Sequence, residues 1–218
     1  MKRSDPENIS LNVPQSLREL PQWVCWRIEE RDGKAAKVPV IPGTGQRASA
    51  TEPSQWRTFD EAMAAFAADE SLAGVGFVFK QGGNICGVDI DDCRNAESGE
   101  LTTWAQAIIT SLASYTEASP SGTGVKVFLQ ASKPGRKCRK AYESGEIEIY
   151  DQARFFTVTG NPIPGTSTCV EQRQEALDAI YAEVFGTEAE RDATTHAFAD
   201  AALSDDEIVR LVSSEHKG

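Results

Sequence analysis

The chain has 218 residues, of which 40% are hydrophobic and 25% are charged, and its formal net charge is −11. This composition is typical of a soluble globular protein that can bury a core of its own. No apolar run reaches about 18 residues, and the polar start M-K-R-S-D-P-E-N lacks the apolar segment of a secretory signal, so we expect neither a membrane span nor export. The five cysteines show no C-x-x-C spacing, which favours reduced thiols in a cytoplasm over disulfides or a zinc site.

The first predicted elements form a hairpin. Residues 23–30 and 34–41 are rich in strand-forming side chains and flank an Asp-Gly turn, which favours an antiparallel pair. Lys34, Lys37 and Arg47 lie on this hairpin or just after it. These side chains either form a polar face or contact phosphate groups.

Three helices are predicted from apolar residues at helical spacing. The clearest covers residues 58–69, where Thr58 and Glu61 fit a capping box. The others cover about residues 103–114 and 170–185, and we expect all three to pack on sheets.

The stretch 84–93, N-I-C-G-V-D-I-D-D-C, begins with mainly apolar residues and contains three acidic residues toward its end. We expect a central strand that runs antiparallel to its predecessor, residues 74–79. Because side chains alternate across a strand, Asp89 and Asp91 share one face and Asp92 lies on the other. Two such carboxylates repel each other unless a cation lies between them, and oxygen ligands suit Mg²⁺ or Mn²⁺. The alternative is a strand end that runs into an acidic turn.

Two strand-like pieces, residues 114–117 and 124–130, flank a turn that contains S-P-S-G-T. Its glycines and small hydroxyl residues let backbone N–H groups approach an anion, although the spacing of a P-loop is absent. Lys126 follows within the second strand, where its ammonium group could reach the same anion. The alternative is an ordinary hairpin turn.

The strand expected at residues 146–150 alternates acidic and apolar residues, so Glu146 and Glu148 share one face. A carboxylate here could complete a metal site. Arg154 opens the next strand and could bind a polyphosphate through two parallel hydrogen bonds. Exposed glutamates and arginines usually form surface pairs, and that is the alternative.

The segment 133–140, K-P-G-R-K-C-R-K, is the strongest basic patch of this acidic chain. A concentrated cationic loop favours contact with a phosphate backbone, and a solvated loop is the alternative. The residues that we expect to contact nucleic acid are Lys133, Arg136, Lys137, Arg139 and Lys140.

Five motifs occur in order between about residues 14 and 165: W-V-C-W-R with K-V-P, W-R-T-F-D-E-A, G-V-D-I-D-D-C, S-P-S-G-T-G-V-K and E-I-Y-D-Q-A-R-F-F-T-V-T-G-N. This ordered set resembles the primase-polymerase catalytic domain of the archaeo-eukaryotic primase superfamily, in the variety that phages, plasmids and mobile elements carry ahead of a helicase. The resemblance implies a mixed α+β fold, with an RRM-like catalytic sheet packed on a smaller N-terminal α/β unit and followed by a C-terminal helical tail.

The resemblance also implies template-directed nucleotidyl transfer by a DNA primase or polymerase on single-stranded DNA, with two Mg²⁺ or Mn²⁺ ions. The family's D-x-D pair falls on Asp89 and Asp91, and its third acidic residue falls on Glu148, with Asp151 as a rival. Lys126 stands where the family has a phosphate-binding histidine, which keeps a positive charge but removes a titratable imidazole. The residues implied in nucleotide binding are Ser119, Ser121, Gly122, Gly124, Lys126 and Arg154.

The expected partners are a single-stranded DNA template or primer and dNTPs or NTPs in a bacterial host cytoplasm, with a C-terminal helicase or accessory domain in a longer protein. We expect residues 1–185 to form the catalytic domain, and residues 186–218 to be an acidic linker with the start of a helical region at about Ala201. The two histidines, His196 and His216, lie in that tail, which excludes His-based catalysis in the core.

Three other functions stay open on the sequence. A metal-dependent nuclease could use the same carboxylates, although it has less need of the serine turn and Arg154. A D-x-D nucleotide-sugar transferase would leave the basic loop unexplained. A non-catalytic module that binds nucleic acid on an RRM-like sheet requires aromatic side chains on the sheet face. Phe155 and Phe156 are the only adjacent aromatic pair in the sequence, and we expect one to face each way.

Overall fold

The computed structural model describes residues 3–31 and 33–186. The chain divides into a first unit, Met1–Val184, and a second, Phe185–Gly218. The predicted acidic linker and helical tail lie outside the described residues, as do both histidines. Within the described part, no helix is long and apolar enough to cross a membrane.

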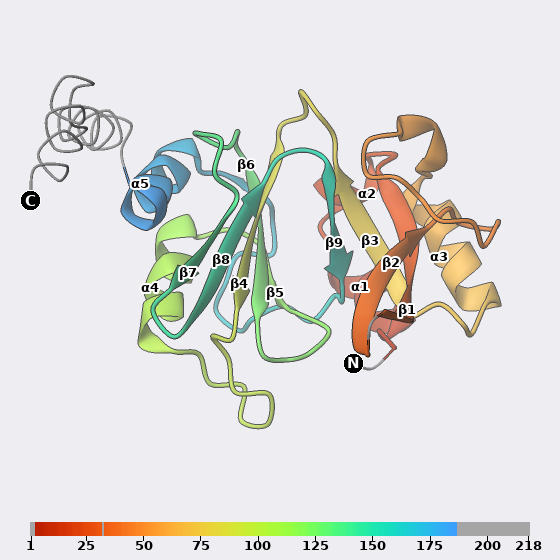
Figure 1. Ribbon diagram of the computed structural model, residues 1–218, viewed down its shortest axis with the longest axis horizontal. Coiled ribbons are helices and arrows are strands. Elements are labelled where there is room, and N and C mark those ends of the chain that lie inside the picture. Colours follow the sequence, from red (N-terminus) through yellow and green to blue (C-terminus); the bar gives the residue numbers. More distant parts are fainter. Residues whose placement is uncertain (1–2, 32, 187–218) are drawn as a thin grey trace, which may run out of the picture. The chain divides into compact units, whose positions relative to one another are not determined.

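A four-stranded antiparallel sheet is built mainly from the N-terminal part of the chain, in the order β2-β1-β3-β9 (Figure 1). Its strands are β1 (Trp23–Arg31), β2 (Lys34–Val40), β3 (Gly74–Phe79) and β9 (Arg154–Val158). The helices of this part are α1 (Pro6–Asn12), α2 (Gln15–Arg18), the 3-10 helix η1 (Pro53–Gln55) and α3 (Phe59–Ala68). The predicted hairpin is confirmed by the pairing of β1 with β2, and the capping box by reciprocal hydrogen bonds of Thr58 and Glu61.

The second sheet has the order β10-β6-β4-β8-β7, and β5 also pairs with β6. Its strands are β4 (Ile85–Asp91), β5 (Thr116–Ala118), β6 (Val125–Gln130), β7 (Arg139–Tyr142), β8 (Gly145–Tyr150) and β10 (Glu171–Gln172). All its pairs are antiparallel except that of β10 with β6. The helices α4 (Thr103–Leu112) and α5 (Gln174–Phe185) lie on its side away from the four-stranded sheet (Figure 1). The predicted α+β class is confirmed.

One predicted strand pairing is wrong. The strands β3 and β4 do not form a hairpin, because β3 pairs with β1 and β9 whereas β4 pairs with β6 and β8. The short connection at residues 80–84 carries the chain from one sheet to the other, and residues 151–153 do the same between β8 and β9. The alternation of side chains defines the faces of a strand but not its neighbours. The predicted central position of β4 is confirmed, since it has a partner on each side.

Buried aromatic rings fill the space between the two sheets. Phe128 of β6 lies with its ring centre 6.2 Å from that of Phe79 on β3 and 5.9 Å from that of Phe156 on β9. Gly87 on β4 faces these rings, and a Cβ atom there would overlap both Phe79 and Phe156. The backbone of β4 can therefore approach the aromatic core closely, which sets the depth of the acidic residues that follow on the same strand.

Candidate active site

Five charged residues lie side by side across the six-stranded sheet. In the strand register, Arg139 is opposite Glu148, Glu148 opposite Asp89, Asp89 opposite Lys126, and Lys126 opposite Glu117. Directly opposite residues on neighbouring strands share a face, with Cβ atoms about 5 Å apart. We call this set the charged row. It brings together charged residues that are scattered between positions 89 and 148 of the sequence.

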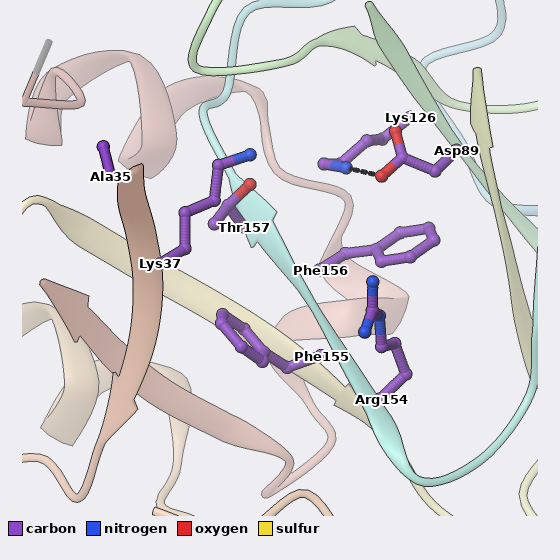
Figure 2. Close-up of a pocket in the computed structure, with 8 residues that line it drawn as sticks. All are labelled: Ala35, Lys37, Asp89, Lys126, Arg154, Phe155, Phe156 and Thr157. Carbon is purple, nitrogen blue, oxygen red and sulfur yellow. Dashed lines mark hydrogen bonds and ion pairs between the residues drawn. The ribbon is translucent and has the colours of Figure 1, made fainter. Parts of the chain in front are cut away.

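Asp89 and Lys126 are the centre of the charged row (Figure 2). The Lys126 ammonium group donates a hydrogen bond to Oδ2 of Asp89 in an ion pair, and it lies 4.5 Å from the centre of the Phe156 ring. Lys126 is only 3% exposed, so each charge compensates much of the other's loss of hydration. The second carboxylate oxygen of Asp89, Oδ1, is buried without a hydrogen-bond partner. A cation placed there would satisfy it.

Asp91 lies two residues further along β4 and is half-buried. Burial and the neighbouring charge of Asp89 raise the pKa of its carboxyl group, while Lys126 and Lys37 act in the opposite direction. Two adjacent carboxylates with too little positive charge around them produce this shift. Asp92, by contrast, is exposed in a left-handed turn with φ of 53°.

Glu148 flanks Asp89 on the other side of the row. Its carboxylate is buried at 5% exposure and is contacted by Arg154 at 2.9 Å and by Arg139 at 3.5 Å. Arg139 comes from β7, which pairs with β8, and Arg154 opens β9 of the four-stranded sheet. Glu148 is therefore fully compensated by the protein's own cations.

The donor chemistry of the aspartates fits a divalent ion, but a complete three-carboxylate cluster is not assembled. In the part of the chain that the structure describes, no group of three or more His, Cys, Asp or Glu side chains is arranged to hold a metal ion. Glu148 is held by arginines, and Asp151 accepts a hydrogen bond at 2.9 Å from the backbone N–H of residue 133, beyond the end of β8. Asp89, with its unpartnered oxygen, and Asp91 are the hard oxygen donors that suit Mg²⁺ or Mn²⁺.

The predicted serine turn adjoins Asp91 and is closed by its own hydrogen bonds. The hydroxyl groups of Ser119 and Ser121 are 2.9 Å apart, and the N–H of Gly122 donates to the carbonyl of Ser119 at 2.9 Å. The N–H of Gly124 donates to the Ser119 hydroxyl at 3.2 Å, and a Cβ on Gly124 would lie 3.0 Å from the Asp91 carboxylate. An anion that binds this turn must therefore exchange internal hydrogen bonds for its own.

The cations of the basic loop differ in their surroundings. The side chain of Lys133 donates to a carbonyl within the loop, and that of Lys140 donates to a carbonyl of α5. Arg139 pairs with glutamates of β8, at 2.6 Å and 3.5 Å. Arg136 and Lys137 are exposed. Part of the positive charge that the sequence concentrates here is thus taken up by the protein itself.

A pocket of about 300 Å³ lies beside the charged row (Figure 2). Its lining includes Lys37 from β2, Arg154, Phe156 and Thr157 from β9, and Asp89 and Lys126 from the six-stranded sheet. The sequence singled out Lys37 as a possible approach to phosphates, but it gave no signal for Thr157, which lies in a run of apolar residues. Only the packing of the two sheets brings these side chains together.

Glu117, the last member of the charged row, was not predicted. It is fully buried and accepts hydrogen bonds from the Tyr115 hydroxyl at 2.9 Å and from the N–H groups of Thr159 at 2.8 Å and Gly160 at 2.9 Å. Burial raises its pKa to about 7, against the opposing effect of these hydrogen bonds. It links β5 to the residues that follow β9. The sequence signal that could have revealed Glu117 is an acidic residue within the strand-like run S-Y-T-E-A.

No family model matches this chain. A search of curated proteins finds similarity to the "DNA Primase-polymerase" of Nitratiruptor phage NrS-1, with 32% identity over 153 residues. The matched region is similar to part of this phage primase-polymerase. It covers 69% of this chain and 21% of the relative, so the chain spans about a fifth of that protein's length. The resemblance predicted from the five sequence motifs is thereby confirmed. The charged row and its pocket are the concentration of buried charge from which a function can be argued.

Proposed function

We propose that this region catalyses template-directed nucleotidyl transfer on single-stranded DNA, as a DNA primase or polymerase. One observation carries the proposal: the buried oxygen of Asp89 that lacks a partner lies beside a second carboxylate and a pocket lined by cations. Acidic donors for a metal and basic donors for phosphates are what this reaction requires at one place. The similarity to a phage primase-polymerase supports the same conclusion.

Asp89 and Asp91 would hold the divalent ions, Mg²⁺ or Mn²⁺, and we expect two of them. When bound, such ions lower the pKa of the attacking 3′-hydroxyl and stabilise charge on the transferred phosphoryl group. Glu148 is the favoured third ligand because it is directly opposite Asp89 on β8, whereas Asp151 lies beyond the end of that strand. Glu148 must release at least one arginine before it can bind an ion.

The triphosphate of the incoming nucleotide would be held by cations that now pair with the carboxylates. Lys126 carries a compact positive charge beside the pocket, so it would orient a phosphate group. Arg154 is 48% exposed at its side chain and lines the pocket, so its guanidinium group can turn from Glu148 to a phosphate. Ser119, Ser121, Gly122 and Gly124 would add hydroxyl and backbone donors from the serine turn.

The DNA strand would be contacted by the basic loop. Arg136, Lys137, Arg139 and Lys140 are all exposed, but Arg139 pairs with Glu146 and Lys140 donates to a carbonyl of α5, so we expect Arg136 and Lys137 to meet the phosphate backbone first. Lys133, Arg139 and Lys140 would act mainly by holding the loop in place. We further propose that a helicase or accessory domain supplies the unwound template.

Extension assays test the proposal. The protein is incubated with Mg²⁺ or Mn²⁺, labelled nucleotides and single-stranded DNA, with and without a primer. Products longer than the primer support polymerase activity, oligomers without a primer support priming, and shortened DNA would instead identify a nuclease. Asp89→Ala and Asp91→Ala should abolish synthesis, whereas Asp92→Asn, a neighbouring change in an exposed turn, should preserve it. Synthesis that survives Asp89→Ala would refute the assignment of the metal site.

A further inference from the structure

The four-stranded sheet contributes its own polar groups to the pocket. Lys37 comes from β2 and Thr157 from β9, and both line the pocket with Lys126 of the other sheet. Figure 2 shows the Lys37 ammonium group and the Thr157 hydroxyl directed to the same part of the pocket, on the side that faces the ion pair of Lys126 and Asp89. Of the phosphate contacts proposed above, only Arg154 comes from this sheet, and neither Lys37 nor Thr157 is among them.

Lys37 is a half-buried cation without a counter-ion. Its side chain forms no hydrogen bond or ion pair with the residues that the structure describes, whereas Lys126 pairs with Asp89 and Arg154 pairs with Glu148. Burial and then the positive charge of Lys126 lower the pKa of Lys37, although Asp89 and Asp91 partly oppose this. A desolvated ammonium group next to other cations is destabilised until an anion lies within hydrogen-bond distance.

Thr157 supplies a second unsatisfied group at the same wall. It is 2% exposed, and its hydroxyl oxygen is buried without a hydrogen-bond partner. Most buried polar side-chain atoms are hydrogen-bonded in folded proteins, so one that is not points to a missing ligand atom when it borders a pocket. A hydroxyl group can donate to an anion that also contacts the neighbouring lysine.

We propose that Lys37 and Thr157 form a phosphate-binding subsite on the four-stranded sheet. A phosphate group bound there would lie between this sheet and Lys126, so it would bridge the two sheets of the fold. The subsite rests on the proposed function and extends it. It adds phosphate contacts from the four-stranded sheet, which carries none of the acidic residues that we expect to bind metal. The phosphate belongs either to the triphosphate of a nucleotide or to the backbone of a DNA strand.

Equilibrium binding separates these sources and does not depend on catalysis. Wild type, Lys37→Met and Lys34→Met are titrated with a non-hydrolysable deoxynucleoside triphosphate in Mg²⁺, and separately with a single-stranded oligonucleotide. Lys34 is the matched control because it is an exposed lysine on the same strand that does not line the pocket. Loss of one charged hydrogen bond should weaken phosphate binding by about tenfold or more in Lys37→Met alone.

Each outcome has a defined meaning. Weaker triphosphate binding with unchanged DNA binding places a nucleotide phosphate in the subsite. Weaker DNA binding, with a shallower salt dependence and unchanged triphosphate binding, places a backbone phosphate there. Binding of both ligands that is unchanged in Lys37→Met, or weakened equally in Lys34→Met, overturns the subsite. If wild type binds triphosphate through Lys37 but extends no primer, the proposed function fails and the subsite stands.

Thr157→Val tests the second contact without a change of shape. Removing a buried hydroxyl that has no partner should leave the melting temperature unchanged or raise it. Affinity for the phosphate ligand should nevertheless fall a few-fold. If Thr157→Val binds as wild type does, the hydroxyl is not part of the subsite.

Discussion

The ammonium group of Lys126 is paired with the carboxylate of Asp89, the residue that we expect to bind a divalent ion. The protein therefore supplies its own cation at the site where a metal cation would act. The side chains of Lys126 and Asp89 are only 4% and 12% exposed, so leaving either charge without its partner would be destabilising. A metal ion at the unpartnered Oδ1 of Asp89 would share this carboxylate with Lys126 and repel its ammonium group, and a nucleotide phosphate is a suitable new partner for that group. Metal and nucleotide should accordingly bind with positive coupling.

The first prediction concerns metal affinity without nucleotide. Lys126→Met removes the competing cation and leaves Asp89 buried without compensation, so Mn²⁺ should bind the free protein roughly tenfold to a hundredfold more tightly than it binds wild type. Electron paramagnetic resonance of unbound Mn²⁺ measures this directly. Lys34→Met is the control, because it removes a distant exposed charge. Equal Mn²⁺ affinity in wild type and Lys126→Met would show that the lysine does not compete with the ion.

The second prediction concerns the pH dependence of stability. Burial raises the pKa of Glu117 to about 7 from a usual value near 4.5, so between these values the folded state binds more protons than the unfolded state. The free energy of unfolding must then fall as pH rises through this window, by about 3 kcal/mol in total from this group. Glu117→Gln cannot ionise, so its unfolding free energy should lose this component. Denaturant unfolding of wild type and Glu117→Gln is measured at pH 5 and at pH 8. The difference in unfolding free energy between the two proteins should change between these pH values. A difference that is constant across pH would contradict the assignment.

A third prediction concerns the contact between β4 and the aromatic core. A methyl group at position 87 would overlap the rings of Phe79 and Phe156, which are almost completely buried and cannot swing into solvent. Gly87→Ala should therefore lower the free energy of unfolding by about 1–3 kcal/mol. Replacing the Phe79 ring by a smaller side chain should relieve the overlap. The double variant Gly87→Ala/Phe79→Leu should therefore lose less unfolding free energy than the two single variants lose in sum. Additive effects in urea unfolding would rule out this contact as the cause.

A fourth prediction separates the two roles of the basic loop. Arg136 and Lys137 are exposed, so changing both to Gln should weaken single-stranded DNA binding and reduce the slope of log affinity against log salt by about 1.4. Lys140→Gln should mainly lower stability, because Lys140 donates to a carbonyl of α5. Fluorescence anisotropy at several salt concentrations gives the slopes. An unchanged slope in the double variant would exclude the loop from the DNA contact.

The sequence predicted the local parts of the site better than its assembly. Strand alternation was enough to put Asp89 and Asp91 on one face of β4, and Glu146 and Glu148 on one face of β8, because a period of two is a property of the strand itself. It could not pair β4 with β6 and β8, nor predict that Lys126 would contact Asp89, since register depends on residues far away in the sequence. Lys37 and Thr157 meet only through the packing of two sheets. That packing is a tertiary property, and their local sequence carries no trace of it.

The passage of the chain between the sheets also affects how the protein can fold. The four-stranded sheet takes β1, β2 and β3 from residues 23–79, but its remaining edge strand, β9, comes from residues 154–158, after most of the other sheet has been made. A fragment that ends at residue 80 would leave the edge of β3 without its partner, which invites pairing with other chains. Neither sheet is a contiguous piece of sequence, so we expect residues 3–184 to unfold in one cooperative transition rather than as two separable lobes.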